Sequence, residues 1–327
     1  MNKKTVACTL LMDGRDTAKL QKTKKTYHDA KKAHLHEKAA ICINLKPYVA
    51  TMDKPPIFHI AFYRFTPIAA PVTLAASLRL LAGELFGSIL VATEGINGVL
   101  AGSAAALTRF EQALTDPAFA AGAFAGLAFK RSNCITPPFA RLKVHVKPEI
   151  VALGASEISS PAASATQRRR SVASPQQWRE LLADENVVVL DNRNSFEYRL
   201  GHFSSAIDPQ VENFRDFSAY LAANAPAWQA AGKRVAMYCT GGIRCEKTSA
   251  RMQDFGLDVV ELEGGILNYF QQIHDAELDW QGECFVFDNR IALDASLHET
   301  ATTAEDVYVA PEDAWRLARA RRLDAAD

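Results

Sequence analysis

The pattern of apolar and polar residues between positions 57 and 102 predicts a short strand-and-helix alternation. IFHIAFYRF (57–65) and SILVAT (88–93) are typical of strands, and between them Val72, Leu74, Leu78, Leu81 and Leu85 recur with helical spacing. This spacing predicts a helix from Pro71 to Phe86. EGING (94–98) holds two glycines and predicts a turn, after which VLAG (99–102) resumes a strand.

The next segment predicts a second helix and a last strand. Ser103 is a suitable N-cap for a helix through Leu107, Phe110 and Leu114. ARLKVHVK (140–147) alternates apolar and polar residues like a half-buried strand. The resulting order, β-α-β-β-α-β, predicts an α+β ferredoxin-like domain.

The second half of the chain has a different pattern. NVVVLD (186–191), KRVAMYC (233–239) and VVELEGG (259–265) are continuous apolar runs, which are typical of strands buried on both faces. Ser174 followed by Pro175 predicts a helix start. Strands that alternate with helices indicate an α/β domain with a parallel sheet. The remaining helical patterns cover Asn213–Ala223, Glu246–Phe255 and Ile266–His274.

These patterns divide the chain into five predicted parts. A basic extension (1–51) with eleven Lys/Arg and four Asp/Glu precedes the ferredoxin-like domain (52–151). We interpret the extension as disordered, as the product of an upstream start with Met52 as the natural start, or as a basic RNA-binding arm. ASEISSPAASATQRRRS lies within a predicted linker (152–172). An α/β domain (173–290) and a C-terminal tail (291–327) follow.

Composition narrows the class of protein. Formal net charge is zero, so global charge does not single out a nucleic-acid partner. Six cysteines in 327 residues do not form a disulfide framework, so we expect reduced thiols in a cytoplasmic protein. The sequence has no apolar run of eighteen residues and no secretory signal pattern, so no membrane span is predicted.

YCTGGIRCEK (238–247) is the strongest candidate for chemistry. A strand, a short glycine-rich loop and a helix direct backbone N–H groups and a helix dipole at the loop centre, where a Cys239 thiolate is favoured. Four residues separate Cys239 from Arg244, against five in cysteine phosphatases, so the loop suits a sulfur-sized anion. We expect support from Thr240, Gly241, Gly242, Ile243 and Arg244. Cys245 is either a resolving thiol or a packed side chain; Cys134 and Cys284 are expected to be structural or incidental.

A second candidate site is a basic stretch that lacks acids, FKRSNCITPPFARLKVHVKP (129–148). It is either a phosphate-tracking RNA surface or a solvated strand face. Phe139 and Tyr63 are aromatic candidates for base stacking that the sequence does not separate from core residues. The basic residues are Lys130, Arg131, Arg141, Lys143 and Lys147.

Several segments resemble known families. LDNRNSFEYRLGHFSSAID (190–208), the cysteine loop and ELEGGILNYF are similar to the rhodanese-domain motifs. FYRFTPI, ATEGINGVLAG, FARLKVHVKPEIVALG and WQGECFVFDNR extend the resemblance, over about residues 57–293, to the rhodanese-containing tRNA uridine hydroxylase family. That family implies a bacterial enzyme that uses molecular oxygen to convert the wobble uridine of tRNA anticodons to 5-hydroxyuridine, with Cys239 as the essential residue.

The resemblance also implies roles for other residues. Asp191 is expected to help organise the loop, Arg193 and Glu197 to form an internal ion pair, and His202 to be a structural hydrogen-bonding residue. Glu94 and Asn97 are expected to form the hairpin turn or a turn that faces the substrate. Residues 1–51 have no counterpart in the family, and residues 294–327 lack the terminal cysteines of many relatives, so no metal site is predicted.

Three functions remain open from the sequence. A tRNA uridine hydroxylase is favoured over a thiosulfate-type sulfurtransferase that works through a Cys239 persulfide, and over a non-catalytic RNA- or protein-binding module. Cys239 attacks C6 of uracil or reacts in an oxidised or persulfidated form. No bound organic cofactor is predicted, oxygen is the expected co-substrate and the tRNA anticodon loop the expected partner; the reductant and the oligomeric state are left open.

Overall fold

The computed structural model describes residues 56–154 and 171–324, which belong to one compact unit, Pro55–Asp327. The predicted basic extension (1–51), with Cys8 and Cys42, and residues 155–170 of the predicted linker lie outside the described residues.

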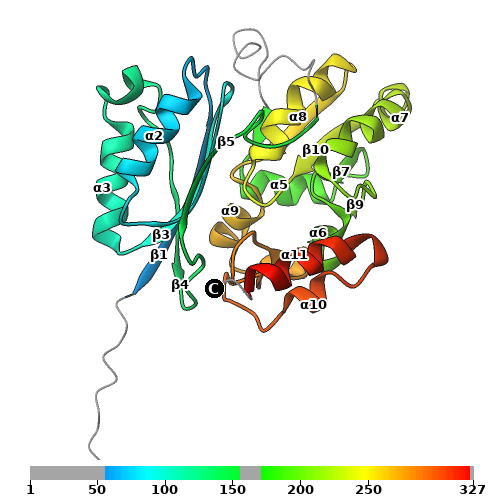
Figure 1. Cartoon of the computed structure of the whole chain (residues 1–327). Coiled ribbons are helices and arrows are strands. Elements are labelled where there is room, and N and C mark those ends of the chain that lie inside the picture. The colour runs from blue at the N-terminus through cyan, green and yellow to red at the C-terminus, as the bar shows by residue number, and fades with distance from the viewer. Residues whose placement is uncertain (1–55, 155–170, 325–327) are drawn as a thin grey trace, which may run out of the picture. The chain divides into compact units, whose positions relative to one another are not determined.

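The first sheet has five strands in the order β4-β1-β3-β2-β5. Its first four strands are antiparallel in the ferredoxin-like order, and β5 is parallel to β2. Helices α2 and α3 cover one face (Figure 1) and bury an apolar core with it. The elements are β1 (Ile57–Phe65), α2 (Pro71–Leu81), β2 (Phe86–Ala92), β3 (Gly95–Gly102), α3 (Ala104–Thr115), a 3-10 turn (Phe119–Gly122), β4 (Lys130–Cys134) and β5 (Leu142–Val146).

The ferredoxin-like prediction is confirmed, with three local corrections. The helix predicted to reach Phe86 ends at Leu81, because the chain turns at Ala82–Gly83 to start β2 at Phe86. The hairpin turn is only Thr93–Glu94, since Gly95 already pairs with Ala92 in β3. The predicted last strand is the fifth one. The fourth, β4, was missed because KRSNC is a polar edge strand without apolar alternation.

The second sheet is parallel, with the order β6-β11-β10-β7-β9, and confirms the predicted α/β class. One face packs against α5 and α9, the other against α7 and α8. The Ser174 cap at Pro175 is also confirmed. The elements are β6 (Ser171–Ala173), α5 (Pro175–Leu182), β7 (Val187–Asp191), α6 (Ser195–Leu200), β8 (Gly201–Phe203), β9 (Ala206–Ile207), a 3-10 turn (Phe214–Asp216), α7 (Phe217–Ala230), β10 (Arg234–Tyr238), α8 (Ile243–Asp254), β11 (Asp258–Leu262) and α9 (Gly265–Gln272).

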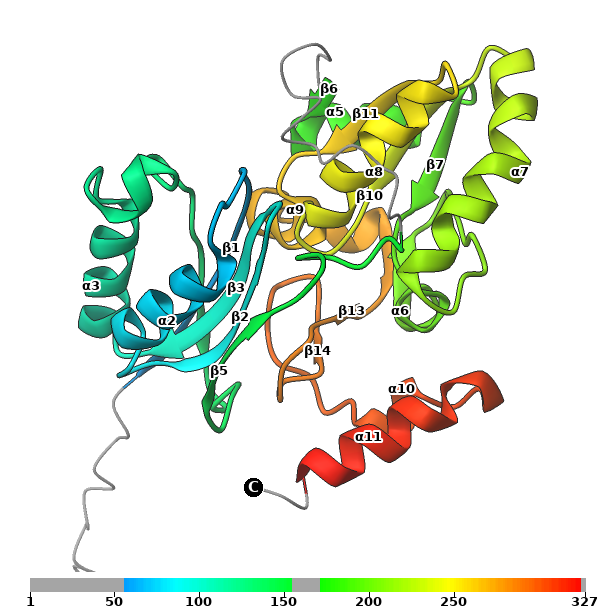
Figure 2. The same cartoon turned by 45° about the horizontal axis from the view of Figure 1, so that its top comes forward.

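The ends of this domain differ from the predicted boundaries. Ser171 and Val172, assigned to the linker, pair with β11 as part of β6. The segment interpreted as a tail (291–327) contains β14, which pairs with β13, and two helices that lie next to each other (Figure 2), α10 and α11. Val307 and Tyr308 bury Phe196 of α6, so apolar packing orders this segment. The elements are a 3-10 turn (Ala276–Leu278), β12 (Trp280–Gly282), β13 (Cys284–Phe285), β14 (Ala292–Leu293), α10 (Ala304–Val307), a 3-10 turn (Pro311–Asp313) and α11 (Ala314–Asp324).

Candidate active site around Cys239

The cysteine loop leaves the carboxyl end of β10 and enters α8 at Ile243. Gly242 is the N-cap of α8 in the left-handed region, at φ 97° and ψ −23°, which favours glycine. In this conformation the Gly242 N–H donates to Cys239 Sγ at 3.0 Å. The loop therefore presents a backbone donor to the sulfur, as the sequence predicted for a glycine-rich anion cradle.

The carbonyl groups of the loop accept hydrogen bonds from outside it. Ile266 N–H donates to Cys239 O at 3.0 Å, and Leu267 N–H donates to Thr240 O at 3.3 Å. Lys130, on β4 of the first sheet, donates to Gly241 O. A Cβ on Gly265 would lie 2.4 Å from Cys239 O, so this turn requires glycine to approach the loop. Because the carbonyl dipoles are held by other partners, they do not oppose the N–H groups around the sulfur.

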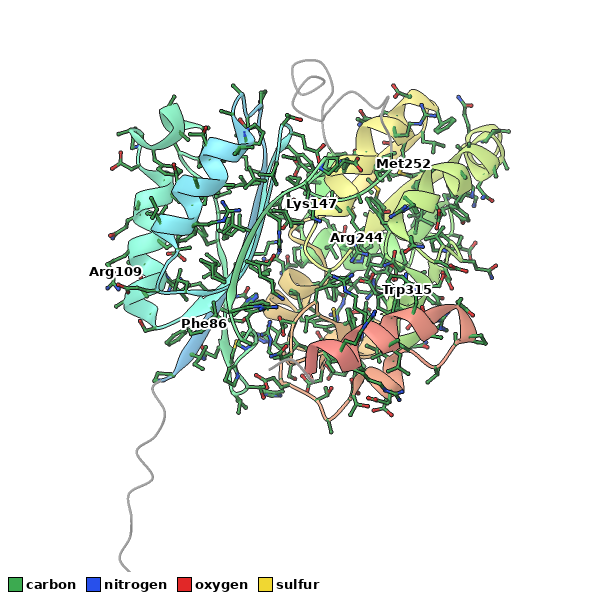
Figure 3. The ribbon with its side chains drawn as sticks, viewed as in Figure 1. Phe86, Arg109, Lys147, Arg244, Met252 and Trp315 are labelled. Atoms are coloured by element: carbon green, nitrogen blue, oxygen red, sulfur yellow. The ribbon has the colours of Figure 1, made fainter. Side chains whose placement is uncertain are left out.

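Arg244 lies in the first turn of α8 (Figure 3) and is buried. Its Nη1 and Nη2 donate to Glu197 Oε1 and Oε2, both at 2.7 Å, which is a bidentate ion pair. Nη2 also reaches Thr240 Oγ1 at 3.3 Å. The arginine thus binds the loop at one end and α6 at the other, and its charge lies beside Cys239.

The predicted Arg193–Glu197 ion pair is wrong. Arg193 Nη2 instead donates to Asp191 Oδ2 at 2.6 Å and to Gly201 O at 2.6 Å, so its guanidinium already has partners. Glu197, in the first turn of α6, faces Arg244. Burial by itself would raise the pKa of Glu197. The charge of Arg244 and its hydrogen bonds to Glu197 have the larger effect, so the pKa of Glu197 lies below its usual range.

Asp191 is the last residue of β7 and is not part of the cysteine loop. It accepts the Tyr238 hydroxyl at 2.7 Å, and Tyr238 directly precedes Cys239. Burial raises the pKa of Asp191, although Arg193 opposes the shift. His202 Nδ1 hydrogen-bonds Tyr198 O at 2.9 Å, which is a structural contact.

The buried cysteines have different acidities. Burial alone raises the pKa of the Cys239 thiol. A hydrogen bond with the Cys245 side chain, the Arg244 charge and the backbone N–H groups of Cys245 and Arg244 outweigh burial and hold it well below its usual range. The pKa of Cys245 is raised well above its usual range, first by burial and then by its contacts with Cys239. Burial raises the pKa of Cys284 to about 12. The opposite directions of these shifts favour Cys239 over Cys245 as the thiol that ionises.

The basic stretch does not form one surface. Lys130 faces the cysteine loop, while Arg131 points to the other side of β4 and pairs with Glu111 at 2.6 Å. On and beside β5, Arg141 and Lys147 are exposed and Lys143 is half-buried; Figure 3 labels Lys147. Only these last three residues remain available together for a ligand.

The aromatic and turn residues named from the sequence hold structural contacts. Phe139 stacks on the buried His59 with ring centroids 6.0 Å apart, and the Tyr63 hydroxyl donates to Glu246 Oε2 at 3.1 Å. Glu94 Oε1 accepts Ile150 N–H at 2.8 Å, and Asn97 Nδ2 donates to Ile150 O at 3.0 Å. Glu94 of the turn and Asn97 of β3 thus both bind Ile150, in the segment that leaves the first sheet.

Sequence reasoning missed three residues near the loop. Lys130 was assigned to RNA, Glu197 to another ion pair, and Phe287 to no role. The Phe287 ring is 63% exposed and lies 5.8 Å from the Arg244 guanidinium. The available signal was its place in CFVFDNR, one of the segments that carry the family resemblance, although nothing in that segment indicates a contact with Arg244.

Between positions 56 and 154 and between 171 and 324, no group of three His, Cys, Asp or Glu side chains is placed to hold a metal ion. Within the same ranges, no helix combines the length and hydropathy needed to cross a membrane.

The fold and the loop define the class: a rhodanese-like cysteine centre joined to an acylphosphatase-like domain. Two family models match accordingly, the UPF0176 acylphosphatase like domain over residues 57–150 and the Rhodanese-like domain over residues 174–272.

Relatives narrow this class to one family. The chain is 49% identical over 218 residues to a tRNA uridine(34) hydroxylase of Synechococcus elongatus, covering 65% of this chain and 76% of that one. It is 43% identical over 256 residues to the protein of the same name from Nitrobacter winogradskyi, covering 77% of this chain and 98% of the relative. The Deinococcus radiodurans protein of that name is 42% identical over 242 residues, with 73% and 76% covered. The chain belongs to the tRNA uridine(34) hydroxylase family.

Proposed function

We propose that this protein hydroxylates C5 of uridine 34 in tRNA and that Cys239 carries the reaction. Family membership supports the substrate and the reaction. The assignment of Cys239 rests on the contacts of its sulfur: Gly242 N–H donates to Cys239 Sγ at 3.0 Å, and the Arg244 charge lies beside it. A thiolate held in this way is available as a nucleophile at neutral pH.

The chemistry that suits this thiolate is addition to C6 of the uracil ring. Addition moves electron density to C5, which then attacks molecular oxygen. One oxygen atom stays on C5 and the other leaves as water, with two electrons and two protons from a soluble two-electron reductant. Loss of the C5 hydrogen as a proton and departure of the thiolate from C6 restore the ring and free Cys239. The protein therefore acts as an oxygen-incorporating oxidoreductase.

Substrate access requires a rearrangement, because the Cys239 side chain has no exposed surface. An anticodon loop presents its bases without the melting of a duplex, so uridine 34 can enter once the covering groups move. We assign Phe287 to base stacking and Arg141, Lys143 and Lys147 to phosphate contacts, since the first is an exposed ring beside Arg244 and the others are basic side chains of one strand region.

The proposal is tested by deleting the gene and measuring 5-hydroxyuridine-derived nucleosides in bulk tRNA. Wild type is expected to restore them and Cys239→Ala to leave them absent, with Cys134→Ala as the matched cysteine control. Unchanged modification in a deletion strain without a redundant pathway would contradict the assigned reaction. Full restoration by Cys239→Ala would contradict the assigned residue.

A sulfurtransferase is the second candidate, and the small cradle favours it because a persulfide fits where a phosphate does not. Cys239 thiolate would take the outer sulfur of thiosulfate, forming a persulfide and releasing sulfite; cyanide would then take that sulfur as thiocyanate. A thiosulfate:cyanide assay on the purified chain decides this. Thiocyanate formation that depends on Cys239, without tRNA hydroxylation in the deletion test, would favour this function.

A further inference from the structure

The sequence contains two Gly–Gly peptides, Gly241–Gly242 and Gly264–Gly265, and both are bound by one side chain. Lys130 Nζ donates to Gly241 O and, at 2.8 Å, to Gly264 O. Gly–Gly is the pair of residues with the largest backbone freedom. Two peptides whose residues have large intrinsic backbone freedom therefore meet at one lysine from the other sheet.

The geometry of a trans peptide links this contact to the sulfur. The carbonyl of Gly241 and the N–H of Gly242 belong to the same planar unit and point in opposite directions. Lys130 holds that carbonyl on one side, and the N–H donates to Cys239 Sγ at 3.0 Å on the other. Rotation of this peptide would turn its oxygen, and a partial negative charge, toward the thiolate.

Little else holds Gly241 on its side-chain side. The one heavy atom within 4 Å of a Cβ built at Gly241, apart from its chain neighbours, is Lys130 Nζ, at 3.9 Å. The Gly264–Gly265 turn is packed more tightly, because a Cβ at Gly265 would lie 2.4 Å from Cys239 O. Lys130 thus joins the carbonyl of the Gly241–Gly242 peptide to the tightly packed Gly264–Gly265 turn.

Lys130 is itself fixed by its strand and its charge environment. It opposes Ala61 in the pairing of β4 with β1. Burial lowers the pKa of its ammonium, and the negative charge of a Cys239 thiolate opposes that shift. The lysine and the cysteine therefore interact through the peptide and directly through charge.

We propose that Lys130 is a positioning residue for Cys239: it fixes the orientation of the Gly241–Gly242 peptide, so that the loop donates a hydrogen bond to the sulfur. The acylphosphatase-like domain then completes the cysteine centre. This inference does not depend on which reaction Cys239 performs, because it concerns the state of the sulfur.

The first test is the pH midpoint of Cys239 alkylation in the full chain. Digestion with trypsin releases residues 235–244, in which Cys239 is the only cysteine, so mass spectrometry follows this residue alone. The midpoint is used because, unlike the absolute rate, it does not depend on how often the buried sulfur is exposed. Lys130→Met is expected to raise the midpoint by about one pH unit or more, since it removes a nearby opposite charge and frees the peptide.

Two further variants make the result specific. Lys130→Arg keeps the charge and the donors and is expected to stay closer to wild type than Lys130→Met. Lys233→Met is the matched control, because Lys233 is half-buried like Lys130 and also donates to a backbone carbonyl, Glu185 O at 2.7 Å. An unchanged midpoint in Lys130→Met, or an equal rise in Lys233→Met, overturns the proposal.

The second test observes the peptides directly. Labelling with carbonyl-13C glycine and 15N glycine restricts the carbonyl–nitrogen correlation to glycine amides that are preceded by glycine, which are Gly242 and Gly265 alone. In wild type we expect the Gly242 signal to shift as Cys239 titrates. In Lys130→Met the position of this signal should change and its response to Cys239 titration should be lost. If Lys130→Met does not fold, Lys130→Gln serves for both tests. A Gly242 signal that keeps its position and its response overturns the proposal.

Discussion

Two lysines, the buried Lys247 and the half-buried Lys130, join the acylphosphatase-like and rhodanese-like parts of the chain in different ways. Lys247, on α8 and 3% exposed, donates to Glu94 Oε1 and Oε2 at 2.8 and 2.9 Å and to Glu149 Oε1 at 2.7 Å. Lys130, on β4, donates to two backbone carbonyls beside Cys239. One lysine neutralises carboxylates, and the other brings a positive charge to the cysteine loop.

The different partners of the two lysines imply different roles, one in the stability of the fold and one in the chemistry of Cys239. A buried cation matched by carboxylates is costly to disrupt, because removal of one partner leaves buried charges without compensation. A cation on carbonyls keeps its charge available to a nearby thiolate. We therefore expect loss of Lys247 to affect mainly unfolding, and loss of Lys130 mainly the acidity of Cys239.

The largest expected effect on stability is that of Lys247→Met. This change leaves Glu94 and Glu149 without their shared cation, and the free energy of unfolding should fall by about 3–5 kcal/mol. Denaturant unfolding of the full chain measures it, with Lys233→Met as a surface control expected within about 0.5 kcal/mol of wild type. A loss below about 1 kcal/mol would show that the Lys247 cluster does not hold the two parts together.

Lys247→Met also tests whether the two lysines have different effects on Cys239. Lys247→Met should leave the pH midpoint of Cys239 alkylation close to the wild-type value wherever the chain remains folded. If Lys247→Met raises that midpoint as much as Lys130→Met does, the two contacts are not functionally distinct.

A smaller effect is expected in the pH dependence of stability. The pKa of Cys239 is lower in the folded chain than its usual value, so its thiolate contributes stability that is fully present above that usual value and is lost as the pH falls through the folded pKa. Relative to Cys239→Ser, wild type should gain up to about 1.4 kcal/mol per pH unit between those two pKa values.

This comparison is best made below about pH 8.5, the pKa of a free cysteine. Cys245 has a raised pKa in the folded chain. Above the pKa of a free cysteine, it therefore lowers the free energy of unfolding as the pH rises, which is opposite to the effect of Cys239. Parallel stability profiles for wild type and Cys239→Ser would contradict a thiolate in the cradle.

The smallest expected effect is that of Tyr63→Phe. It removes the hydroxyl that donates to Glu246 Oε2 at 3.1 Å, a partly buried contact between the two parts of the chain. A loss of about 0.5–1.5 kcal/mol in unfolding free energy is expected, as for a single hydrogen bond. A loss as large as that of Lys247→Met would move the main connection from the carboxylate cluster to this tyrosine.

The sequence predicted what is local and missed what is distant. Cys239, Gly242 and Arg244 lie within one loop, so spacing and glycine content were sufficient to place them. Glu197 lies 47 residues from Arg244, and Lys130 lies 111 residues from Gly241, so no periodicity relates them. Such contacts follow from how the two sheets pack.

Strand β4 shows the same limit within one domain. Its residues KRSNC carry no apolar alternation because the strand forms the sheet edge and is half-buried at most. The pattern of charge therefore suggested an RNA surface. In the structure, alternation along β4 instead directs Lys130 to the cysteine loop and Arg131 to Glu111.

Hydroxylation by molecular oxygen through Cys239 is tested by growing the deletion strain that carries this chain under 18O2, followed by mass spectrometry of tRNA nucleosides. We expect the 5-hydroxyuridine-derived nucleoside to gain 2 mass units per incorporated oxygen atom with wild type and to be absent with Cys239→Ala. A nucleoside that retains 16O, or that forms without Cys239, would contradict it.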